Sequence, residues 1–351
     1  MNTPSPTVTI VFLVFNRREQ LRTSLQQMLV ESDYEAGRVE VVVVDNASAD
    51  GSAEMVASDF PEVRLVRRRE NSGVSGINDG FAVATGEWVL ALDDDCYLPP
   101  DGLRRAVAAA AEHRADLVSF GVVSSSDPDL RFDRGYRTGL LSFWGCAVLI
   151  RRKVLDELGG YDPAIFVWAN ELEFMVRFFD RAFRHLHLPE VVAVHMKADL
   201  LAPLEYVSSF TYLMNSRHYA YVAGKLLRPR DALATLVAVL ANIALDAIRL
   251  DPRARHGVPA ALRGFWGGVR RRRPVSPEVS ATYRREFLSF LPPWRVSRGF
   301  WDLMLAIPVV IYRAARHLPP ADVGRREAYL HQRARYYPTE AATLELGPRA
   351  T

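Results

Sequence analysis

The chain has 351 residues, of which 49% are hydrophobic and 24% charged, and its formal net charge is +3. A chain of this length and composition is a folded protein with room for two domains, which excludes an intrinsically disordered protein. The small net charge excludes a strongly basic nucleic-acid-binding protein, so no nucleic-acid partner is expected.

The cysteine content and the N-terminus bear on the compartment. Cys96 and Cys146 are the two cysteines of the sequence. They are too few for a disulfide framework or a cysteine zinc site, and they fit a reducing cytoplasm. Residues 1–6 have neither the basic start nor the apolar run of a signal peptide. The sequence therefore predicts a cytoplasmic protein.

Apolar runs alternate with amphipathic stretches up to about residue 120. Several runs are continuous and rich in β-branched residues, which is typical of strands buried on both faces. Asp101 stands at the N-cap position of an alanine-rich helix. This alternation predicts an α/β fold with a Rossmann-like, mostly parallel sheet and helices on both faces. The predicted strands are 7–14, 39–44, 64–66, 88–92 and 116–123, and the predicted helices are 18–30 and 103–113.

Polar residues follow three of these predicted strands. Asn16 comes after the first strand, Asp45 after the second, and the run Asp93-Asp94-Asp95 after the fourth. In open α/β sheets, ligands bind beyond the carboxyl ends of the strands. We therefore expect these side chains to converge in space.

The character of the sequence changes after residue 200. Residues 232–250 and 300–317 have helical periodicity, whereas the glycine- and arginine-rich segment 263–274 is predicted to be a loop. The tail 336–351 is predicted to be poorly ordered. The chain should therefore consist of two domains, residues 1–200 and a mainly helical region at 201–351.

The helix predicted at 232–250 is almost long enough to cross a bilayer. Asn242, Asp246 and Arg249 interrupt its second half. Polar residues of this kind are costly in the hydrocarbon core. We expect a buried or interfacial helix.

The strongest local pattern is Leu90-Ala-Leu-Asp-Asp-Asp-Cys96. In an extended segment, residues two apart point the same way, so Asp93 and Asp95 face one ligand while Asp94 faces elsewhere. Two convergent carboxylates suit a hard divalent cation, which in turn binds phosphate oxygens. The plain alternative is a turn with three solvated acids.

A second pattern is the glycine-containing segment at residues 71–80, with glycines at 73, 76 and 80. Glycines let a backbone approach a ligand closely, but a flexible loop leading into a helix has the same pattern. A dinucleotide-binding fingerprint needs its glycines directly after the first strand, where this chain has Phe15-Asn-Arg-Arg18. The sequence therefore disfavours a nicotinamide-dependent dehydrogenase.

A third pattern is an acidic helix start at residues 168–177. Asn170 is a good N-cap, and Glu171 falls in the first turn. Acids favour helix N-termini for electrostatic reasons alone, so this pattern by itself is no evidence of catalysis.

In this order and spacing, the segments resemble the family-2 glycosyltransferases with the GT-A fold, from residue 7 to about residue 195. One piece means little, whereas the ordered set is specific. The resemblance implies that residues 1–200 are a GT-A catalytic domain. Acceptor binding or membrane association is the role expected for the helical region 201–351, which lies outside the resemblance. The pieces are Val14-Phe-Asn-Arg17, Val44-Asp-Asn-Ala-Ser-Ala-Asp-Gly-Ser52, residues 71–80, Asp93-Asp-Asp95, Phe143-Trp-Gly-Cys146, Leu158-Gly-Gly-Tyr-Asp162, residues 170–177 and Val191-Val-Ala-Val-His195.

This resemblance implies transfer of a sugar from a nucleoside diphosphate to an acceptor hydroxyl, with inversion and with Mg²⁺ or Mn²⁺. Asp93 and Asp95 match the Asp-x-Asp pair that holds the metal and diphosphate, and His195 matches a histidine near the metal. Asp45 matches a contact to the nucleoside base or ribose. The resemblance also places Asn16, Asn71, Gly73, Asn78 and Asp94 in the site for the nucleotide sugar.

Glu171 matches the acidic position that acts as the general base. Relatives usually have Glu-Asp where this chain has Asn170-Glu171, so a register shifted by two would make Glu173 the counterpart. Single displacement needs a base that takes the acceptor's proton, and departure of the diphosphate needs a cation. Trp144 and Trp168 are candidates for stacking on the acceptor, and ordinary core packing explains them equally well.

The donor should be a UDP- or dTDP-sugar, and the acceptor a glycan, a lipid-linked saccharide or a small molecule. The run 270–273 of arginines beside Phe265 and Trp266 predicts peripheral contact with the inner face of the cell membrane. A solvated basic loop is the alternative.

Three other functions remain open. A catalytically silent subunit that binds nucleotide sugars or glycans is disfavoured by the intact aspartate pair. Nucleotidyl transfer lacks a glycine-rich phosphate loop after the first strand. A processive synthase would carry a Gln-x-x-Arg-Trp motif and membrane helices, which Gln332-Arg-Ala-Arg-Tyr336 matches only superficially.

Overall fold

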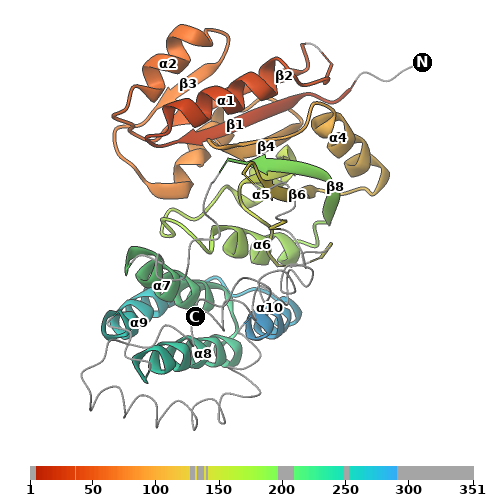
Figure 1. The fold of residues 1–351 in the computed structure, drawn as a ribbon. Helices are drawn as coiled ribbons and strands as arrows, with labels where there is room; N and C mark the ends of the chain where they lie inside the picture. The colour runs from red at the N-terminus through yellow and green to blue at the C-terminus, as the bar shows by residue number, and fades with distance from the viewer. Residues whose placement is uncertain are drawn as a thin grey trace, which may run out of the picture. The chain divides into compact units, whose positions relative to one another are not determined.

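A computed structural model gives the structure of residues 5–35, 37–126, 131–132, 138–139, 141–196, 209–248 and 253–290 (Figure 1). The chain divides into two compact units, Met1–Leu200 and Leu201–Thr351. The helix expected at 300–317, the Gln332–Tyr336 segment and the tail at 336–351 lie outside the described residues.

The described part of the first unit is built on an eight-stranded sheet with the order β3-β2-β1-β4-β7-β6-β8-β5. β1 pairs in parallel with β2 and β4, and β2 pairs in parallel with β3. β7 runs antiparallel to β4 and β6, and β5 runs antiparallel to β8. The prediction of a mostly parallel sheet is confirmed. The strands are β1 (Val8–Val14), β2 (Val39–Asp45), β3 (Arg64–Arg67), β4 (Trp88–Asp93), β5 (Cys96–Tyr97), β6 (Leu117–Ser124), β7 (Ala147–Arg151) and β8 (His185–His195).

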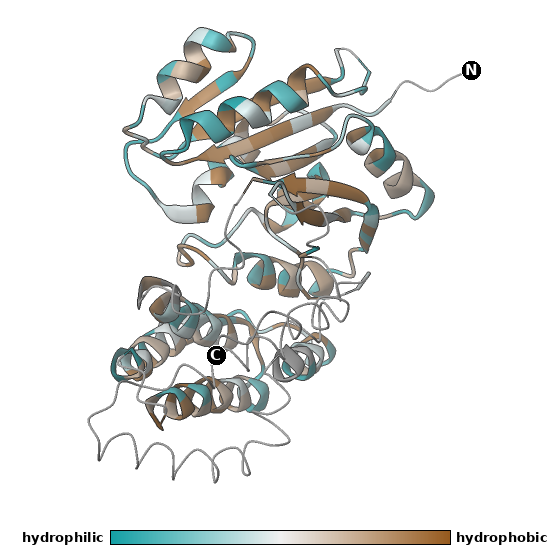
Figure 2. Cartoon of the chain, in the orientation of Figure 1, coloured by the Kyte–Doolittle hydropathy of each residue, from teal (hydrophilic) through white to brown (hydrophobic). Residues whose placement is uncertain are grey.

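Helices cover both faces of this sheet, as the sequence predicts. Alternate strand residues feed two separate cores: Ile10 and Phe12 of β1 belong to one, and Val11 to the other. Figure 2 shows the strands as the most consistently hydrophobic part of this unit. One core contains side chains of α1 (Arg18–Leu29), α2 (Ser52–Asp59) and α4 (Gly102–Glu112), and the other contains side chains of α3 (Asn78–Val83), α5 (Arg152–Leu158) and α6 (Asn170–Asp180).

The expected strands and helices before residue 125 all form, with bounds within one or two residues of those predicted. Asp101 stands at the N-cap of α4, yet its side chain makes no capping hydrogen bond; its Oδ2 accepts one from Arg105 Nη1 at 3.4 Å. The sequence did not indicate β5 or β7. β5 has two residues and β7 five, too few to show a period.

The second unit is helical in its described part, with α7 (Ser209–Leu226), α8 (Pro229–Ile248), α9 (Ala254–Arg270) and α10 (Pro277–Phe290). The loop predicted at 263–274 is wrong for residues 263–270, which belong to α9, whereas residues 271–274 lie outside any helix or strand, as predicted. A Cβ at Gly264 would lie 2.0 Å from the Arg217 carbonyl oxygen, and one at Gly268 2.2 Å from that of Tyr221. These glycines are therefore contact points with α7 and not helix breakers.

The apolar helix predicted at 232–250 forms as α8. Among the described residues it is the one helix long and apolar enough to cross a membrane, and 33% of its most apolar stretch is buried. Its ends are tied to neighbouring helices: Asp231 accepts a hydrogen bond from Ser280 and pairs with Arg284 on α10, and Asp246 accepts one from Tyr212 on α7. In this structure α8 is thus one member of a helix bundle.

A buried histidine pair on β8 should make stability depend on pH. His185 Nδ1 accepts the Gly139 N–H at 3.3 Å, and Ser119 Oγ lies 2.8 Å from His185 Nε2 and 3.0 Å from His187 Nδ1. Burial, followed by the nearby His187, lowers the pKa of His185 to about 3.

Between pH about 3 and about 6.5 the unfolded chain binds a proton at residue 185 that the folded chain does not, so stability rises with pH across this window. Replacing His185 by Gln should remove up to about 1.4 kcal/mol per pH unit from that slope. Urea unfolding between pH 4 and 7 measures it. The exposed His113 provides the control, since His113→Gln should leave the slope unchanged.

Candidate active site

The strand register brings the predicted site residues to one end of the sheet. On one side of β1, Val14 pairs with Asp45 of β2, and on the other side Leu13 pairs with Asp93 of β4. His195 ends β8, where it pairs with Cys96 of β5 and with Ser124 of β6. Because parallel strands share their carboxyl ends, residues more than 100 positions apart in the sequence meet here.

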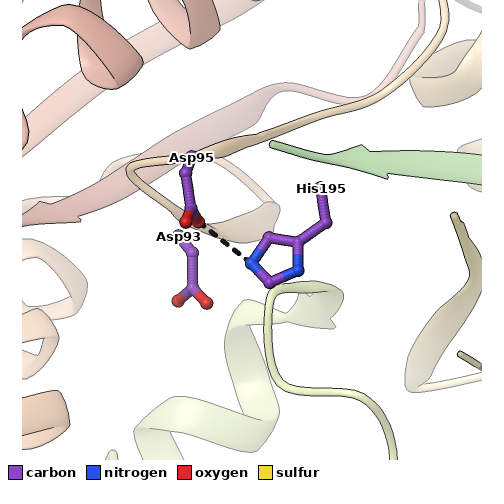
Figure 3. A group of neighbouring side chains, drawn as sticks. All are labelled: Asp93, Asp95 and His195. Carbon is purple, nitrogen blue, oxygen red and sulfur yellow. Dashed lines mark ion pairs between the residues drawn. The ribbon is translucent and has the colours of Figure 1, made fainter. Parts of the chain in front are cut away.

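Asp93, Asp95 and His195 form a cluster in which one ligand atom from each lies within 4.8 Å of the others (Figure 3). His195 Nε2 is 3.1 Å from Asp95 Oδ1. Asp95 and His195 are buried, with exposed fractions of 3% and 5%, whereas Asp93 is open to solvent. The cluster is thus anchored in the protein and approachable through Asp93.

The electrostatics of this cluster fit a cation. Desolvation by the surrounding protein and then the charge of Asp95 raise the pKa of Asp93 to about 7. Desolvation likewise raises the pKa of Asp94 to about 7, although Arg17 opposes the shift. A bound cation would offset this unfavourable concentration of carboxylates. Two carboxylate oxygens and an imidazole nitrogen also form a donor set suited to a divalent metal.

β4 ends at Asp93, so Asp94 and Asp95 lie in a turn and not in the extended segment that the sequence predicts. Asp94 is not one of the clustered residues. Its carboxylate accepts hydrogen bonds from the Phe15 N–H at 3.3 Å and from Arg17 Nη1 at 3.2 Å. Arg17 Nη1 also donates to Asp95. Burial lowers the pKa of Arg17, but the charges of Asp94 and Asp95 outweigh this and hold it above its ordinary value. Asp94 therefore links the loop after β1 to the metal-ligand segment.

Sequence reasoning did not assign a role to Arg17. Its guanidinium, 41% exposed, is the positive group that the structure places against Asp94 and Asp95. The feature of the sequence that could have indicated this role is the position of Arg17 just after the first strand. A single arginine there is more often a surface residue, and only the register of β1 against β4 shows what it contacts.

The helix that carries Glu171 begins in an unusual backbone. Trp168 and Ala169 both have positive φ angles, of 55° and 62°. The left-handed region is unfavourable for residues with a Cβ, most of all for a bulky one, and such strain clusters at functional sites. The predicted N-cap at Asn170 is wrong: Ala169 is the N-cap residue, and Asn170 uses its amide to donate to the Ile165 carbonyl at 3.1 Å.

Glu171 lies in the first turn of α6, packed against Gly145. A Cβ at residue 145 would come 1.9 Å from Glu171 Oε1, so a methyl group there would displace the carboxylate. Burial raises the pKa of Glu171, and a hydrogen bond from its own backbone N–H only partly opposes this. Burial therefore outweighs any stabilisation of the charged carboxylate by the helix N-terminus. The charge of Glu171 in turn contributes to the raised pKa of Asp93.

Glu173 occupies a different environment from Glu171. It is fully buried and forms a bidentate ion pair with Arg177, with N–O distances of 2.7 to 3.0 Å. Arg177 also donates to the carbonyl oxygens of Leu158 and Gly160. Glu173 thus holds α6 to the Gly-Gly-Tyr turn, which favours Glu171 over Glu173 as the reactive carboxylate.

Two predicted donor residues connect loops at this edge. Asn16 has a left-handed φ of 54°, and its Oδ1 accepts the Ala49 N–H at 2.7 Å. Asn78 is bonded through both its amide groups to the backbone of Tyr161, at 2.8 and 2.9 Å. Asn78 is therefore a bridge inside the protein, and a contact from it to a nucleotide has no support in this arrangement.

Three other predicted donor residues lie beside each other at the ends of β2 and β3. Asp45 is buried and accepts the Ser48 N–H at 3.1 Å. Asn71 Oδ1 accepts hydrogen bonds from Asn46 Nδ2 and the Gly73 N–H, both at 2.8 Å. A Cβ on Gly73 would lie 1.9 Å from the Phe166 carbonyl oxygen, so a glycine is needed where this loop passes the chain leading to α6.

The two predicted acceptor residues differ in exposure. Trp144 stacks on Phe132, with ring centroids 5.5 Å apart and planes at 18°, and packs against one of the cores. Trp168 is 38% exposed. A structural role accounts for Trp144, while Trp168 presents an accessible ring two residues after Phe166 and three before Glu171.

Part of this site lies in a stretch that matches a known family. Residues 9–166 match the family model described as glycosyl transferase family 2. Over these residues the chain is similar to that family, in agreement with the order of its motifs. The match ends before α6 and β8, which supply Glu171 and His195.

Curated proteins also resemble part of the chain. The succinoglycan biosynthesis protein ExoO of Rhizobium meliloti is 36% identical over 139 residues, which are 37% of this chain and 39% of ExoO. The undecaprenyl-phosphate 4-deoxy-4-formamido-L-arabinose transferase of Pseudomonas savastanoi is 33% identical over 172 residues, 44% of this chain and 50% of the relative. The matched stretch is thus half or less of each relative.

Solved structures are similar at lower identity. The mannosyltransferase PcManGT from Pyrobaculum calidifontis, in complex with GDP-Man and Mn²⁺, is 22% identical with a TM-score of 0.48, covering 88% of this chain and 87% of that one. S. aureus TarS 1–349 is 17% identical with a TM-score of 0.48, covering 80% and 92%.

The two glutamates of α6 should differ sharply in their effect on stability. Glu173→Gln leaves the Arg177 guanidinium with a broken buried ion pair, which costs about 3 kcal/mol. Glu171→Gln removes a carboxylate whose raised pKa shows that folding disfavours its charge, so the free energy of unfolding at pH 7 should hold or rise slightly. Urea denaturation of both variants measures the difference. Equal losses would contradict the assignment.

Proposed function

We propose that this protein is an inverting glycosyltransferase that moves a sugar from a nucleoside diphosphate to an acceptor hydroxyl. The observation that carries the proposal is the cluster of Asp93, Asp95 and His195, with the half-buried Glu171 close enough to raise the pKa of Asp93, in a domain similar to family-2 glycosyltransferases. One group of side chains suits a metal diphosphate, and a separate carboxylate suits a proton acceptor. Their proximity is what a single displacement requires.

Asp93, Asp95 and His195 would hold the metal. When bound, a divalent cation neutralises the negative charge that develops on the departing diphosphate. Mg²⁺ prefers oxygen ligands, whereas Mn²⁺ accepts imidazole more readily, so the histidine favours Mn²⁺. Arg17 fixes the orientation of Asp95 from the opposite side.

Asp45, Asn71 and the backbone at Gly73 would receive the nucleoside. The Asp45 carboxylate can accept the N3–H of uracil or thymine or a ribose hydroxyl, and the Asn71 Nδ2 group can donate to an oxygen of the base or ribose. This composition supports a UDP- or dTDP-sugar as donor. Trp168 would stack on the acceptor, since a planar apolar ring face suits the apolar face of a sugar.

Glu171 would act as the general base on the acceptor side. A carboxylate with a raised pKa is a stronger base than an exposed one, and burial raises the pKa of Glu171. Its position against Gly145, close to Asp93, directs it toward the reacting centre. Proton removal by Glu171 and charge neutralisation at Asp93 and Asp95 then act on opposite ends of the same displacement.

The acceptor class follows less directly from the residues. A relative named as an undecaprenyl-phosphate transferase supports a lipid-linked acceptor, and one named in succinoglycan biosynthesis supports a glycan. Either would be met at the inner face of the cell membrane by a cytoplasmic protein.

Metal-dependent donor binding should require Asp95. Asp95→Asn removes one ligand charge and weakens the hold of Arg17, so the affinity for UDP or dTDP with Mn²⁺ should fall by at least about tenfold, while metal-free affinity should change little. Isothermal titration with and without Mn²⁺ measures both. Asp156→Asn, at an exposed site on α5, is the control. Unchanged Mn²⁺-dependent affinity in Asp95→Asn would sink the metal assignment.

Transfer should require the Glu171 carboxylate. Glu171→Gln preserves shape but cannot accept a proton, so turnover should fall by about 10²–10⁴ with donor affinity intact. Gly145→Ala should act through the same group, because its methyl would displace the carboxylate. In wild type, turnover should decrease as pH falls through the raised pKa of Glu171, at a higher pH than for an ordinary glutamate.

Product assays with candidate acceptors, followed by NMR of the anomeric proton, test both the rate and the inversion. A retained configuration would refute single displacement. If Glu171→Gln transferred at the wild-type rate, the acceptor would be a phosphate, whose oxygen is already ionised and needs no base. Donor binding without transfer to any acceptor would favour the silent binding subunit.

A further inference from the structure

One face of helix α9 packs against its neighbours in the second unit. A Cβ at Gly264 or Gly268 would collide with the backbone of α7, and one at Gly257 would lie 3.0 Å from Ile243 of α8 and Tyr212 of α7. The other buried residues of α9, such as Ala261, lie on the same side by helical periodicity. This small-residue face fixes which side of α9 is turned outward.

The outward face combines apolar and basic side chains. Val258, Leu262 and Trp266 are 40%, 38% and 58% exposed, and their four-residue spacing places them in one stripe. Arg255, Arg263 and Arg270 are also exposed on the outer side of this helix. Trp266 is thus the centre of an amphipathic surface, here called the α9 outer face and consisting of these six residues.

The charged residues of α9 and of the segment that follows it are all basic. The sequence contains no Asp or Glu between Asp251 and Glu278. Within the arginine run that follows α9, Arg272 is turned inward and donates to the carbonyl oxygens of Gly224 and Leu227, at 3.1 and 2.8 Å. Its neighbours Arg271 and Arg273 are exposed and extend the positive surface.

We propose that the α9 outer face binds the surface of a bilayer that contains anionic phospholipids. A helix with aromatic and aliphatic residues on one stripe and arginines beside it lies in the interface plane, with its rings among the headgroups and its guanidiniums near phosphates. Anionic lipid then attracts each arginine while Leu262 and Trp266 enter the apolar boundary. This is a docking mode and not a membrane span.

A second copy of the chain fits the same surface less well. A two-fold symmetric interface would bring the α9 outer face against itself and place Arg255, Arg263 and Arg270 of two subunits close together. Like charges across an interface are costly. A bilayer offers an apolar interior to the apolar stripe and negatively charged headgroups to the arginines, so it matches both parts of the α9 outer face.

Vesicle co-sedimentation of the full chain tests this inference. Wild type should bind phosphatidylcholine vesicles containing about one third phosphatidylglycerol, bind pure phosphatidylcholine weakly, and be released as salt is raised. Each arginine near an anionic surface is worth roughly fivefold in partitioning, so Arg255→Gln/Arg263→Gln should lower the partition coefficient about 25-fold. Trp266→Ala should lower it about tenfold.

Matched variants in the first unit provide controls. Arg69→Gln/Arg114→Gln changes the net charge by the same amount at exposed sites, and Val30→Ala removes an exposed apolar side chain; neither should alter partitioning by more than about twofold. Circular dichroism confirms that each variant is folded. The assay needs no donor or acceptor, so its result is independent of whether the proposed transfer is correct.

Three results would overturn the inference. The first is that wild type fails to sediment with anionic vesicles, and the second is that it binds pure phosphatidylcholine equally well. The third is that Arg255→Gln/Arg263→Gln and Arg69→Gln/Arg114→Gln reduce binding to the same extent. Light scattering distinguishes membrane binding from dimerisation. If Trp266→Ala converts a dimer to a monomer and leaves vesicle binding unchanged, the α9 outer face is a subunit interface.

Discussion

The crowding of carboxylates at the carboxyl edge of the sheet is the constraint on which the site depends. Asp93, Asp94 and Asp95 follow one strand, and Glu171 is close enough to add to the raised pKa of Asp93. Such a group is unfavourable in a partly desolvated place unless positive charge balances it. Arg17 supplies part of this positive charge from the loop after β1, and a divalent cation held by Asp93, Asp95 and His195, as proposed, would supply more.

The fold places these acids in different surroundings, although Asp94 and Asp95 share Arg17. Asp94 is directed to Arg17 and the Phe15 N–H, Asp95 lies between Arg17 and His195, and Asp93 stays open to solvent. Glu173, two residues after Glu171, is neutralised by Arg177 inside the protein. These four acidic residues therefore differ in their chemistry, because their environments differ.

Glycines set the close approaches in both units, through the absence of a Cβ. Gly145 makes room for the Glu171 carboxylate, and Gly73 lets its loop pass the chain leading to α6. In the second unit, Gly264 and Gly268 allow α9 to lie against the backbone of α7. The same contact turns the arginines and Trp266 of α9 outward, so the packing of the helices and the character of its outer face have one cause.

The sequence by itself determined the α/β class, the bounds of the early strands and helices, and the convergence of Asp45 with Asp93, because hydrophobic period and strand ends are local properties. Tertiary structure alone decided which glutamate of α6 is neutralised by a buried ion pair, since Glu171 and Glu173 cannot be told apart until the positions of Arg177 and Gly145 are known. It also showed that residues 263–270 are helical, against the expectation from their glycines, and that Arg17 contacts the aspartates. These outcomes depend on contacts between segments far apart in the chain, which carry no local sequence pattern.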